Sequence, residues 1–435
     1  MDSQALVRND ATMTTNVSHS DARAFAVDVV HQLRAAGHEA VWAGGCVRDA
    51  LLDITPKDYD VATSARPEQV VELFGKRRTI GVGASFGVIM LLGHKRSQLQ
   101  VEVATFRTDG TYSDGRRPDS VEYCSAEEDA LRRDFTINGM FFDPVEERVI
   151  DYVEGRKDLQ RRLIRAIRDP HERISEDKLR MLRAVRFAAR FDFRLEEKTA
   201  AAIRTHVADL HQVSVERISQ ELRHMFSHPR KRMALNLLSE SSLFPVVFPQ
   251  VSVEAFDATC RVVEHLALGT FEQVMSLLLR EHLCVSESGF RRRAAEISKM
   301  CRNLKLSNDE TDAIGWLSDG SESCHDLNSM PLHIMKPLFA DERHELLVDI
   351  LRAEATAEMR SATDLQFLDE WLESTSPEER NPAAFVDGAD LKALQIEPGP
   401  QFTSILSQIR KEQLDEQITT REQALERASI LNQQS

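Results

Sequence analysis

The feature that most constrains this chain is a Gly-Gly turn that is followed by two closely spaced aspartates. Gly44 and Gly45 join a short apolar segment, residues 39–43, to a helix-forming segment, and Asp58 and Asp60 follow on a second extended segment. Backbone N–H groups at a glycine turn that opens a helix attract an anion such as phosphate. Side chains two residues apart lie on the same face of a strand, so both carboxylates face one way and favour a cation between them. The pattern predicts phosphate binding beside a divalent metal, which suits nucleotidyl or phosphoryl transfer.

Composition limits the remaining possibilities. The chain has 435 residues, which exceeds one ordinary hydrophobic core and is typical of about three domains. The first 20 or so residues are polar and predict a loose leader and not a signal peptide, and no apolar run is long enough to span a membrane. Six cysteines without Cys-x-x-Cys spacing argue against a zinc site and for a reducing, cytoplasmic location. The net charge of −15 means that a nucleic acid would need a local basic face.

The hydrophobic pattern divides the chain into a mixed part and a helical part. Extended signals occur at 39–43, 59–63, 80–92 (in pieces joined by a turn), 99–106, 121–123 and 149–152, with helical signals between them, among them 126–139. From about residue 164 onward helix follows helix. We therefore predict an α+β fold, in which an N-terminal head with a mixed β-sheet precedes an all-helical neck, body and tail. The expected parts are the leader (1–20), the head (21–163), the neck (164–235), the body (236–335) and the tail (336–435).

A third acid is a candidate for the metal site. Glu102 lies on the strand predicted over 99–106, which can lie beside the strand of Asp58 and Asp60. Three carboxylates suit a site for two metal ions. Taken alone, Glu102 is more typical of a polar residue on the solvent face of a half-buried strand than of a metal ligand.

A second group of polar residues recurs on the helix predicted over 176–191. Asp177, Arg180 and Arg183 follow at three-residue steps, so they are expected on one side of that helix. A carboxylate accepts hydrogen bonds and a guanidinium donates them in a planar fork, so this set can match the edge of a nucleotide base. Arg186 adds positive charge. The alternative is a salt-bridged face exposed to solvent.

Together these segments resemble the class II CCA-adding enzyme and bacterial poly(A) polymerase family, within the polymerase-β-like nucleotidyltransferases. The matching blocks are Gly44–Asp49 with Asp58–Asp60, Arg132–Met140, Asp151–Leu163 and Glu176–Arg186, and in the tail Asp387–Leu391, Pro398–Pro400, Gln413–Asp415 and Thr420–Glu422. The resemblance is strong over residues 25–235 and moderate over roughly the last 50. The chain departs from the family at Gly139, where alanine is common, and at Lys178, where proline is frequent.

The resemblance implies roles for individual residues. Asp58 and Asp60 would bind Mg²⁺, with Glu102 as the third catalytic carboxylate. Asp177 and Arg180 would pair with the incoming base as a protein template. The loop over 107–118 matches the flexible loop with which such enzymes change from C to A addition. The full implied nucleotide-binding set is Gly44, Gly45, Arg48, Arg133, Asp134, Asn138, Asp177, Arg180, Arg183 and Arg186.

The implied activity is template-independent addition of CCA to the 3′ end of tRNA from CTP and ATP. The helical part would hold the tRNA, for example through Arg230, Lys231, Arg232 and Arg291–Arg293, and neither a membrane nor a protein partner is implied. Poly(A) synthesis and addition of A alone remain alternatives; the tail is not basic, which disfavours the first. The intact loop at Asp109–Arg117 argues against addition of C alone. A non-catalytic RNA-binding protein would not need all three carboxylates.

Overall fold

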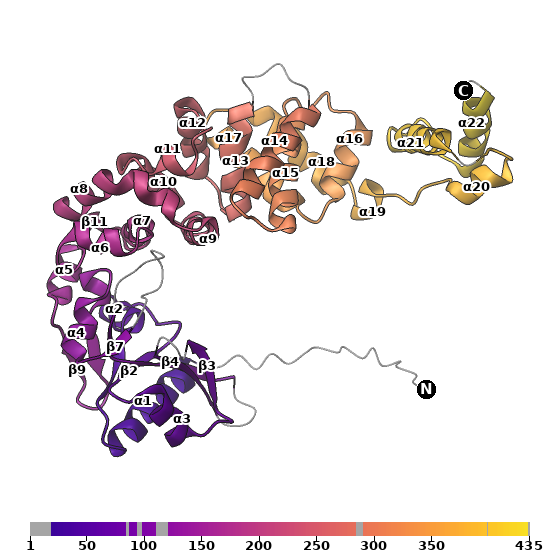
Figure 1. Ribbon diagram of the computed structural model, residues 1–435. Helices are drawn as coiled ribbons and strands as arrows, with labels where there is room; N and C mark the ends of the chain where they lie inside the picture. Colours follow the sequence, from indigo (N-terminus) through magenta and orange to yellow (C-terminus); the bar gives the residue numbers. More distant parts are fainter. Residues whose placement is uncertain are drawn as a thin grey trace, which may run out of the picture. The chain divides into compact units, whose positions relative to one another are not determined.

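The computed structural model describes residues 19–83, 87–93, 98–109, 121–283, 290–397 and 399–433 (Figure 1). The chain divides into two compact units, which are described one at a time. The first comprises residues 1–217 and 237–246, and the second comprises 218–236 and 247–435. A mixed sheet in the N-terminal part and helices after it confirm the predicted α+β fold class. The boundaries that we predict between head, neck, body and tail stay predictions.

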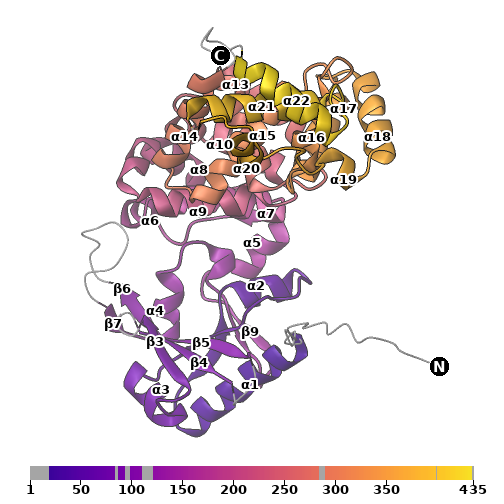
Figure 2. The ribbon, with the colours of Figure 1, turned by 90° about the vertical axis from the view of Figure 1, so that its right-hand side faces the viewer.

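A mixed sheet of seven strands is the centre of the first unit (Figure 2). Its strand order is β3-β4-β5-β2-β1-β8-β9, with β2 and β5 parallel and the other neighbours antiparallel. The strands are β1 (Ala40–Ala43), β2 (Asp60–Thr63), β3 (Thr79–Gly83), β4 (Val88–Leu92), β5 (Gln100–Thr105), β8 (Phe141–Asp143) and β9 (Arg148–Ile150). Two further small sheets are β6 (Arg107–Asp109) with β7 (Val121–Tyr123), and β10 (Leu163–Ile164) with β11 (Arg194–Leu195).

The predicted flexible loop over 107–118 falls mainly outside the described residues. Its first three residues form β6, which pairs antiparallel with β7. Residues 110–118, which make up the rest of that loop, are not among the described residues.

Helices cover both faces of the large sheet. Helix α1 (His19–Ala35) buries an apolar stripe, including Val29 and Leu33, against β1, β2 and β5, and α3 (Pro67–Phe74) packs on β4 and β5. On the other face α4 (Ala126–Leu131) packs into a cluster that contains Ala62 of β2 (Figure 2). Alternate residues of a strand share a face. Asp60, two residues before Ala62, therefore projects from the same face as α4.

The first unit contains further helices. They are α2 (Gly45–Leu51), η2 (Thr136–Asn138), α5 (Gly155–Arg161), α6 (Pro170–Glu176), α7 (Arg180–Phe191), α8 (Glu197–His206) and η3 (Val207–Gln212). The helix predicted over 126–139 is shorter than expected, because α4 ends at Leu131. The backbone at Phe135 is extended and bridges to Ala166, and the short η2 follows.

The helix predicted over 176–191 is also interrupted, which corrects one inference. Helix α6 ends at Glu176, and Asp177 has an extended backbone with φ −142° and ψ 103°. Oδ1 of Asp177 accepts a hydrogen bond from the N–H of Leu179 at 3.1 Å, an interaction that competes with helical hydrogen bonding. Asp177 therefore lies at the corner between two helices and does not share a helix face with Arg180.

The second unit is helical among the residues that the structure describes. Its helices are α12 (Val253–Val263), α13 (Phe271–Leu283), α14 (Phe290–Asn303), α15 (Asn308–Ser323), α16 (Leu332–Ala340), α17 (His344–Thr356), α18 (Ala362–Ser374), α19 (Pro377–Arg380), α20 (Gly388–Ala393), α21 (Pro400–Leu414) and α22 (Arg421–Gln433). Both units share α9 (Val215–Phe226), α10 (Lys231–Glu240) and α11 (Phe244–Val247). Across the described ranges, no helix has the length and apolar character needed to cross a membrane.

The interior of the second unit contains charged side chains. Arg280 and Arg360 both meet Glu354, at 2.6 and 2.8 Å, and each of the three side chains is less than one-tenth exposed. Lys231, which we predicted as a surface contact for tRNA, is only 5% exposed. That prediction is therefore wrong. The side chains of Arg291–Arg293 are outside the described residues.

Candidate active site

The predicted glycine turn is present and requires glycine at its first position. Gly44 has a φ of 70°, in the left-handed region that L side chains rarely adopt. A Cβ atom at this position would also lie 3.1 Å from NH1 of Arg133. Helix α2 begins at Gly45, and both glycines line one pocket. The unpaired N–H groups of the first turn are therefore available to an anion there.

One carboxylate, that of Asp60, lines this pocket, and the charges of two others, Glu102 and Asp58, act on it. Asp60 opens β2 and lies opposite Glu102 in the parallel register with β5. Burial, and then the charges of Glu102 and Asp58, raise the pKa of Asp60 to about 6, while Arg133 opposes that rise. Asp58 is exposed and precedes β2 by two residues, so our placement of it on the strand is wrong.

The repulsion around Asp60 fits a divalent cation. A cation between carboxylates relieves this repulsion and favours their ionised forms. Carboxylate oxygens are also the protein ligands that suit Mg²⁺. Among the described residues, no group of three or more His, Cys, Asp or Glu side chains is already positioned to hold an ion. The site therefore has suitable donors but has no preformed cage.

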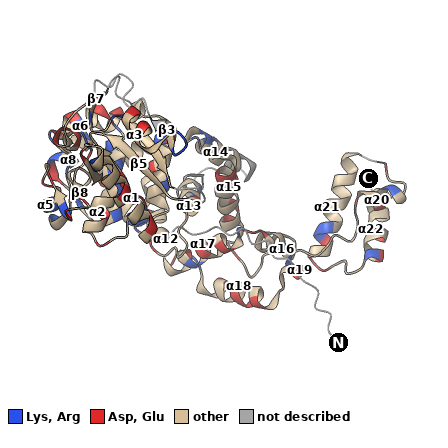
Figure 3. Cartoon of the chain, turned by 90° about the horizontal axis from the view of Figure 1, so that it is seen from below, with Lys and Arg blue, Asp and Glu red and all other residues tan. Residues whose placement is uncertain are grey.

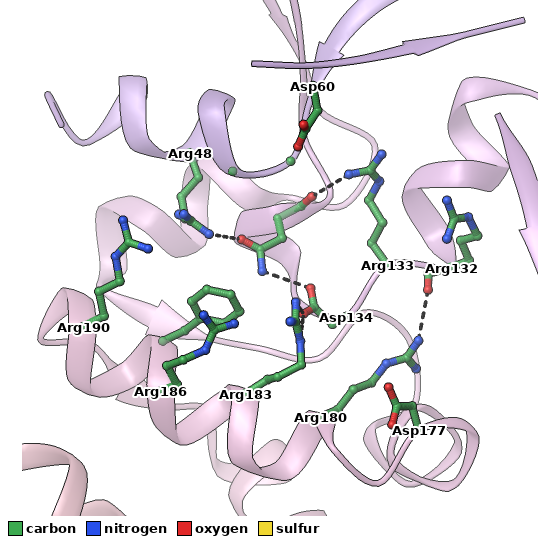
Figure 4. Close-up of a pocket in the computed structure, with 14 residues that line it drawn as sticks. Arg48, Asp60, Arg132, Arg133, Asp134, Asp177, Arg180, Arg183, Arg186 and Arg190 are labelled. Carbon is green, nitrogen blue, oxygen red and sulfur yellow. Dashed lines mark hydrogen bonds and ion pairs between the residues drawn. The ribbon is translucent and has the colours of Figure 1, made fainter. Parts of the chain in front are cut away.

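One pocket of about 490 Å³ collects most of the predicted site residues (Figure 4). It is lined by every predicted catalytic or nucleotide-binding residue except Asp58 and Glu102. Its lining comprises Gly44, Gly45, Arg48, Asp60, Arg132, Arg133, Asp134, Asn138, Asp177, Arg180, Arg183, Arg186, Phe187 and Arg190. Seven of these are arginines, four of them on α7. Such a density of fixed positive charge suits a polyphosphate.

A chain of polar contacts, buried at Arg48, Asn138 and Asp134, runs through the lining of the pocket to Arg183. Arg48 is 4% exposed, and its NH1 donates to Oδ1 of Asn138 at 2.6 Å. The amide nitrogen of Asn138 donates to Oδ1 of Asp134 at 3.0 Å, and Nε and NH2 of Arg183 donate to Oδ2 of Asp134 at 2.9 and 2.6 Å. Burial acts to raise the pKa of Asp134, but Arg183, Asn138 and Arg180 outweigh it and lower the pKa to about 2. Asp134 therefore stays ionised and fixes Arg183.

Carboxylates behind the pocket hold the other arginines. Asp129 of α4 is 1% exposed and accepts from Arg132 and Arg133, with nitrogen–oxygen distances of 2.7 and 2.9 Å. Asp49 is paired in the same way with Arg48 and with Arg190, at 2.6 and 3.3 Å. The guanidinium groups are therefore held in position without a nucleotide.

The two residues predicted to read the base are also already paired. Asp177 accepts two hydrogen bonds from Arg217 of α9, at 2.7 and 3.1 Å. NH1 of Arg180 donates to Oε2 of Glu176 at 2.7 Å and to the carbonyl of Arg173 at 2.8 Å. These contacts fix the directions in which the carboxylate of Asp177 can accept further hydrogen bonds and the guanidinium of Arg180 can donate them.

Sequence reasoning missed several of these residues. Arg217 is separated from Asp177 by 40 residues, and no local pattern connects them. Asp129 and Asp49 look like ordinary helix acids, and only the structure shows that they hold arginines. Arg190 could have been found, since it continues the spacing of Arg183 and Arg186 along the same helix.

Comparison with known proteins agrees with this geometry. Residues 40–165 match the model of the poly A polymerase head domain, and residues 192–254 match a model described as the probable RNA and SrmB-binding site of polymerase A. The CCA-adding enzymes of Levilactobacillus brevis and Lacticaseibacillus paracasei are 32% and 30% identical; the matches cover 88% and 92% of this chain and 91% and 94% of theirs. The enzyme of Enterococcus faecalis is 47% identical over 197 residues, which is 45% of this chain and 47% of that one.

A solved structure supports the same assignment. The CCA-adding enzyme of Bacillus stearothermophilus in complex with CTP superposes with a TM-score of 0.74 at 25% identity, covering 95% of this chain and 99% of that one. A Thermotoga maritima CCA-adding enzyme in complex with tRNA shares the fold, with a TM-score of 0.63 at 19% identity. The chain described here is an enzyme that belongs to the CCA-adding family of tRNA nucleotidyltransferases, which have the poly(A) polymerase type of head.

Proposed function

We propose that this chain adds CCA to the 3′ end of tRNA from CTP and ATP, in the cytoplasm, at the arginine-lined pocket. The observation that supports this most directly is the pocket itself. It places seven arginines, among them the base-pairing candidate Arg180, together with Asp177 and the half-buried Asp60 around a volume of about 490 Å³. A nucleoside triphosphate has the matching parts, namely a polyphosphate, a base and a reacting phosphorus that needs a metal nearby.

Asp58, Asp60 and Glu102 hold Mg²⁺ in this proposal. An ion held by these carboxylates would supply the Lewis acidity that activation of the RNA 3′-hydroxyl and departure of pyrophosphate need. The raised pKa of Asp60, about 6, is consistent with a carboxylate that is destabilised until a cation binds.

The glycine turn and the arginines bind and orient the triphosphate. Figure 4 shows the guanidinium group of Arg133 beside Asp60, where the reacting phosphate would be held, and the glycine turn that opens α2 lines the same pocket. Asn138 and Asp134 lie between Arg48 and Arg183, in position to meet the ribose. Since carboxylates fix these arginines beforehand, little reorganisation is needed when the substrate enters.

Asp177 and Arg180 select the base. A carboxylate acceptor beside a guanidinium donor can pair with cytosine or adenine, and it leaves a buried group unpaired against other bases. Arg217 and Glu176 hold the two side chains, so the template is rigid. A rigid template explains how a protein can specify nucleotides without a nucleic-acid template.

Incubation with each nucleotide separately tests the proposal. A tRNA that lacks its 3′ CCA should gain two C residues from CTP, and then one A after ATP is added. A tRNA that ends in CC should accept A alone. Unlimited A addition to any RNA would indicate poly(A) synthesis, and use of ATP without CTP would indicate an A-only enzyme; either result overturns the proposal. The Asp60→Asn variant should be inactive, whereas Glu72→Gln, on the exposed side of α3, should retain wild-type activity.

A further inference from the structure

Two histidines and a carboxylate form a cluster where the start of α6 meets the end of α8. His171 lies in the first turn of α6, and His206 is the last residue of α8. The two helices pack against each other. Nδ1 of His171 is 3.3 Å from Nε2 of His206, and the ring planes are inclined by 62°. Neither histidine lines the arginine pocket, so the cluster is separate from the proposed catalytic site.

The hydrogen bond at Nδ1 of His206 determines whether its Nε2 donates or accepts a hydrogen bond. Nδ1 of His206 lies 3.0 Å from Oδ2 of Asp209. An ionised carboxylate only accepts hydrogen bonds, so this Nδ1 carries the hydrogen. Nε2 of a neutral His206 then presents a lone pair toward His171. Without a metal, Nδ1 of His171 must donate its hydrogen to that lone pair.

The spacing of the facing nitrogens matches two ligands of one metal ion. Zinc–nitrogen bonds of about 2.0–2.1 Å at the tetrahedral angle place two nitrogens about 3.3–3.4 Å apart. The distance between His171 and His206 is 3.3 Å. A carboxylate on the far nitrogen of a ligating histidine is also the usual arrangement that orients such a ligand, and Asp209 supplies it.

We propose that Nδ1 of His171 and Nε2 of His206 bind one divalent transition-metal ion of the Zn²⁺ type. Asp209 orients His206, and water completes the coordination. The ion takes the place of the hydrogen between the two rings; His171 loses that hydrogen to water and takes one up at its Nε2, so the ring stays neutral. Imidazole donors favour Zn²⁺, Ni²⁺ or Cu²⁺ over Mg²⁺. The site is therefore chemically different from the carboxylate site at Asp60.

The exposure of the cluster is compatible with binding from solution. His171 is exposed, so its ring can turn toward an ion and leave the remaining coordination positions to water. The side chain of His206 is only 20% exposed and is held by Asp209, so one ligand is already oriented. No third His, Cys, Asp or Glu side chain completes the set within the described residues, so binding is expected to be reversible.

Such an ion would connect α6 directly to α8. Helix α6 carries Arg173 and Glu176, which contact Arg180, and it ends at Asp177. Fixing the first turn of α6 therefore stabilises the helix that leads to the proposed base-reading corner. The proposal itself concerns the metal site and does not depend on the identity of the substrate.

Zinc titration of the full, untagged chain tests the proposal. The protein is titrated with ZnCl₂ by calorimetry, with excess MgCl₂ present to occupy the carboxylate site. Wild type should bind one zinc equivalent that His171→Gln and His206→Gln each lose. Asp209→Asn should retain the site with about 10- to 100-fold weaker affinity. His211→Gln is the matched control, because this exposed histidine lies five residues after His206 and bonds only to the carbonyl of Ala208 among its described contacts.

Thermal unfolding gives an independent measurement. Zn²⁺ should raise the melting temperature of wild type and of His211→Gln, and leave that of His206→Gln unchanged. Melting curves without zinc establish that each variant is folded. Equal zinc stoichiometry and affinity in wild type, His171→Gln and His206→Gln would overturn the proposal. An equal zinc-induced rise in melting temperature in wild type and His206→Gln would also overturn it.

Discussion

Replacing Asp60 with Asn should make the metal-free protein more stable while it abolishes activity. Burial and the charges of Glu102 and Asp58 raise the pKa of Asp60 from 3.8 to about 6. An acid with a raised folded-state pKa stabilises the fold fully below its unfolded pKa, and this contribution is lost as the pH rises through the folded value. This rise of about two units in the pKa of Asp60 corresponds to about 3 kcal/mol of lost stability above pH 7. Solvent screening at this partly exposed side chain makes that figure an upper bound.

The pH dependence of unfolding measures this effect. Asn is neutral at every pH, so the gain in unfolding free energy of Asp60→Asn over wild type should be near zero at about pH 4 and should approach its maximum above about pH 7. Urea unfolding in the presence of a chelator gives the difference at each pH. Mg²⁺ should then stabilise wild type and not the variant. The exposed control Glu72→Gln should change stability by less than about 0.5 kcal/mol. The reasoning fails if Asp60→Asn and wild type are equally stable at pH 7.5, or if Asp60→Asn still incorporates nucleotides.

Three further substitutions test other contacts. Arg217→Met frees the carboxylate of Asp177, so discrimination between CTP and UTP should fall by about tenfold or more, with a smaller change in triphosphate affinity. Single-nucleotide kinetics measure this discrimination, and an unchanged value would exclude a positioning role for Arg217. Gly44→Ala places a side chain at a φ of 70° and 3.1 Å from NH1 of Arg133, and it should cost about 1–2 kcal/mol of unfolding free energy and raise KM for both nucleotides. Glu354→Ala leaves buried arginines without their acid and should cost about 3–5 kcal/mol in urea unfolding; a loss below about 1 kcal/mol would contradict the pairing.

The sequence predicted those parts of the site that depend on local pattern. The turn at Gly44 follows from a glycine pair before a helix, and the projection of Asp60 follows from strand alternation. The pairing of Asp60 with Glu102 does not follow from local pattern, because the hairpin of β3 and β4 lies between their two strands in the sequence. Their parallel register is a property of the whole sheet. Its signal in the sequence was therefore only that both residues are acids on extended segments.

The corner at Asp177 shows where local reasoning fails. Helical periodicity favours one continuous helix through this position, and the residue spacing alone does not contradict it. The side chain of Asp177 caps the N–H of Leu179, and Arg217 from α9 binds the same carboxylate. A capping interaction and a distant arginine together outweigh helix propensity, which amounts to less than about 1 kcal/mol per residue. Only the three-dimensional structure reveals the second of these partners.

The pairing of the pocket arginines reconciles the proposed polyphosphate site with an acidic chain. The chain has a net charge of −15, yet seven arginines line one pocket. Arg48 and Arg190 meet the carboxylate of Asp49, Arg132 and Arg133 meet that of Asp129, Arg183 meets Asp134, and Arg180 meets Glu176. A guanidinium has five N–H donors, so one carboxylate fixes its direction and still leaves donors for phosphate.

The distribution of charge outside the pocket adds selectivity. Acidic and basic residues are interspersed along the helices in Figure 3, and the excess of acids gives the chain a field that repels RNA phosphates at long range. Non-specific RNA affinity comes from counterion release at clustered cations. Seven arginines gather in the pocket, so a triphosphate or an RNA end that enters it would gain contacts with clustered cations. An acidic chain can therefore favour the end of an RNA over its length.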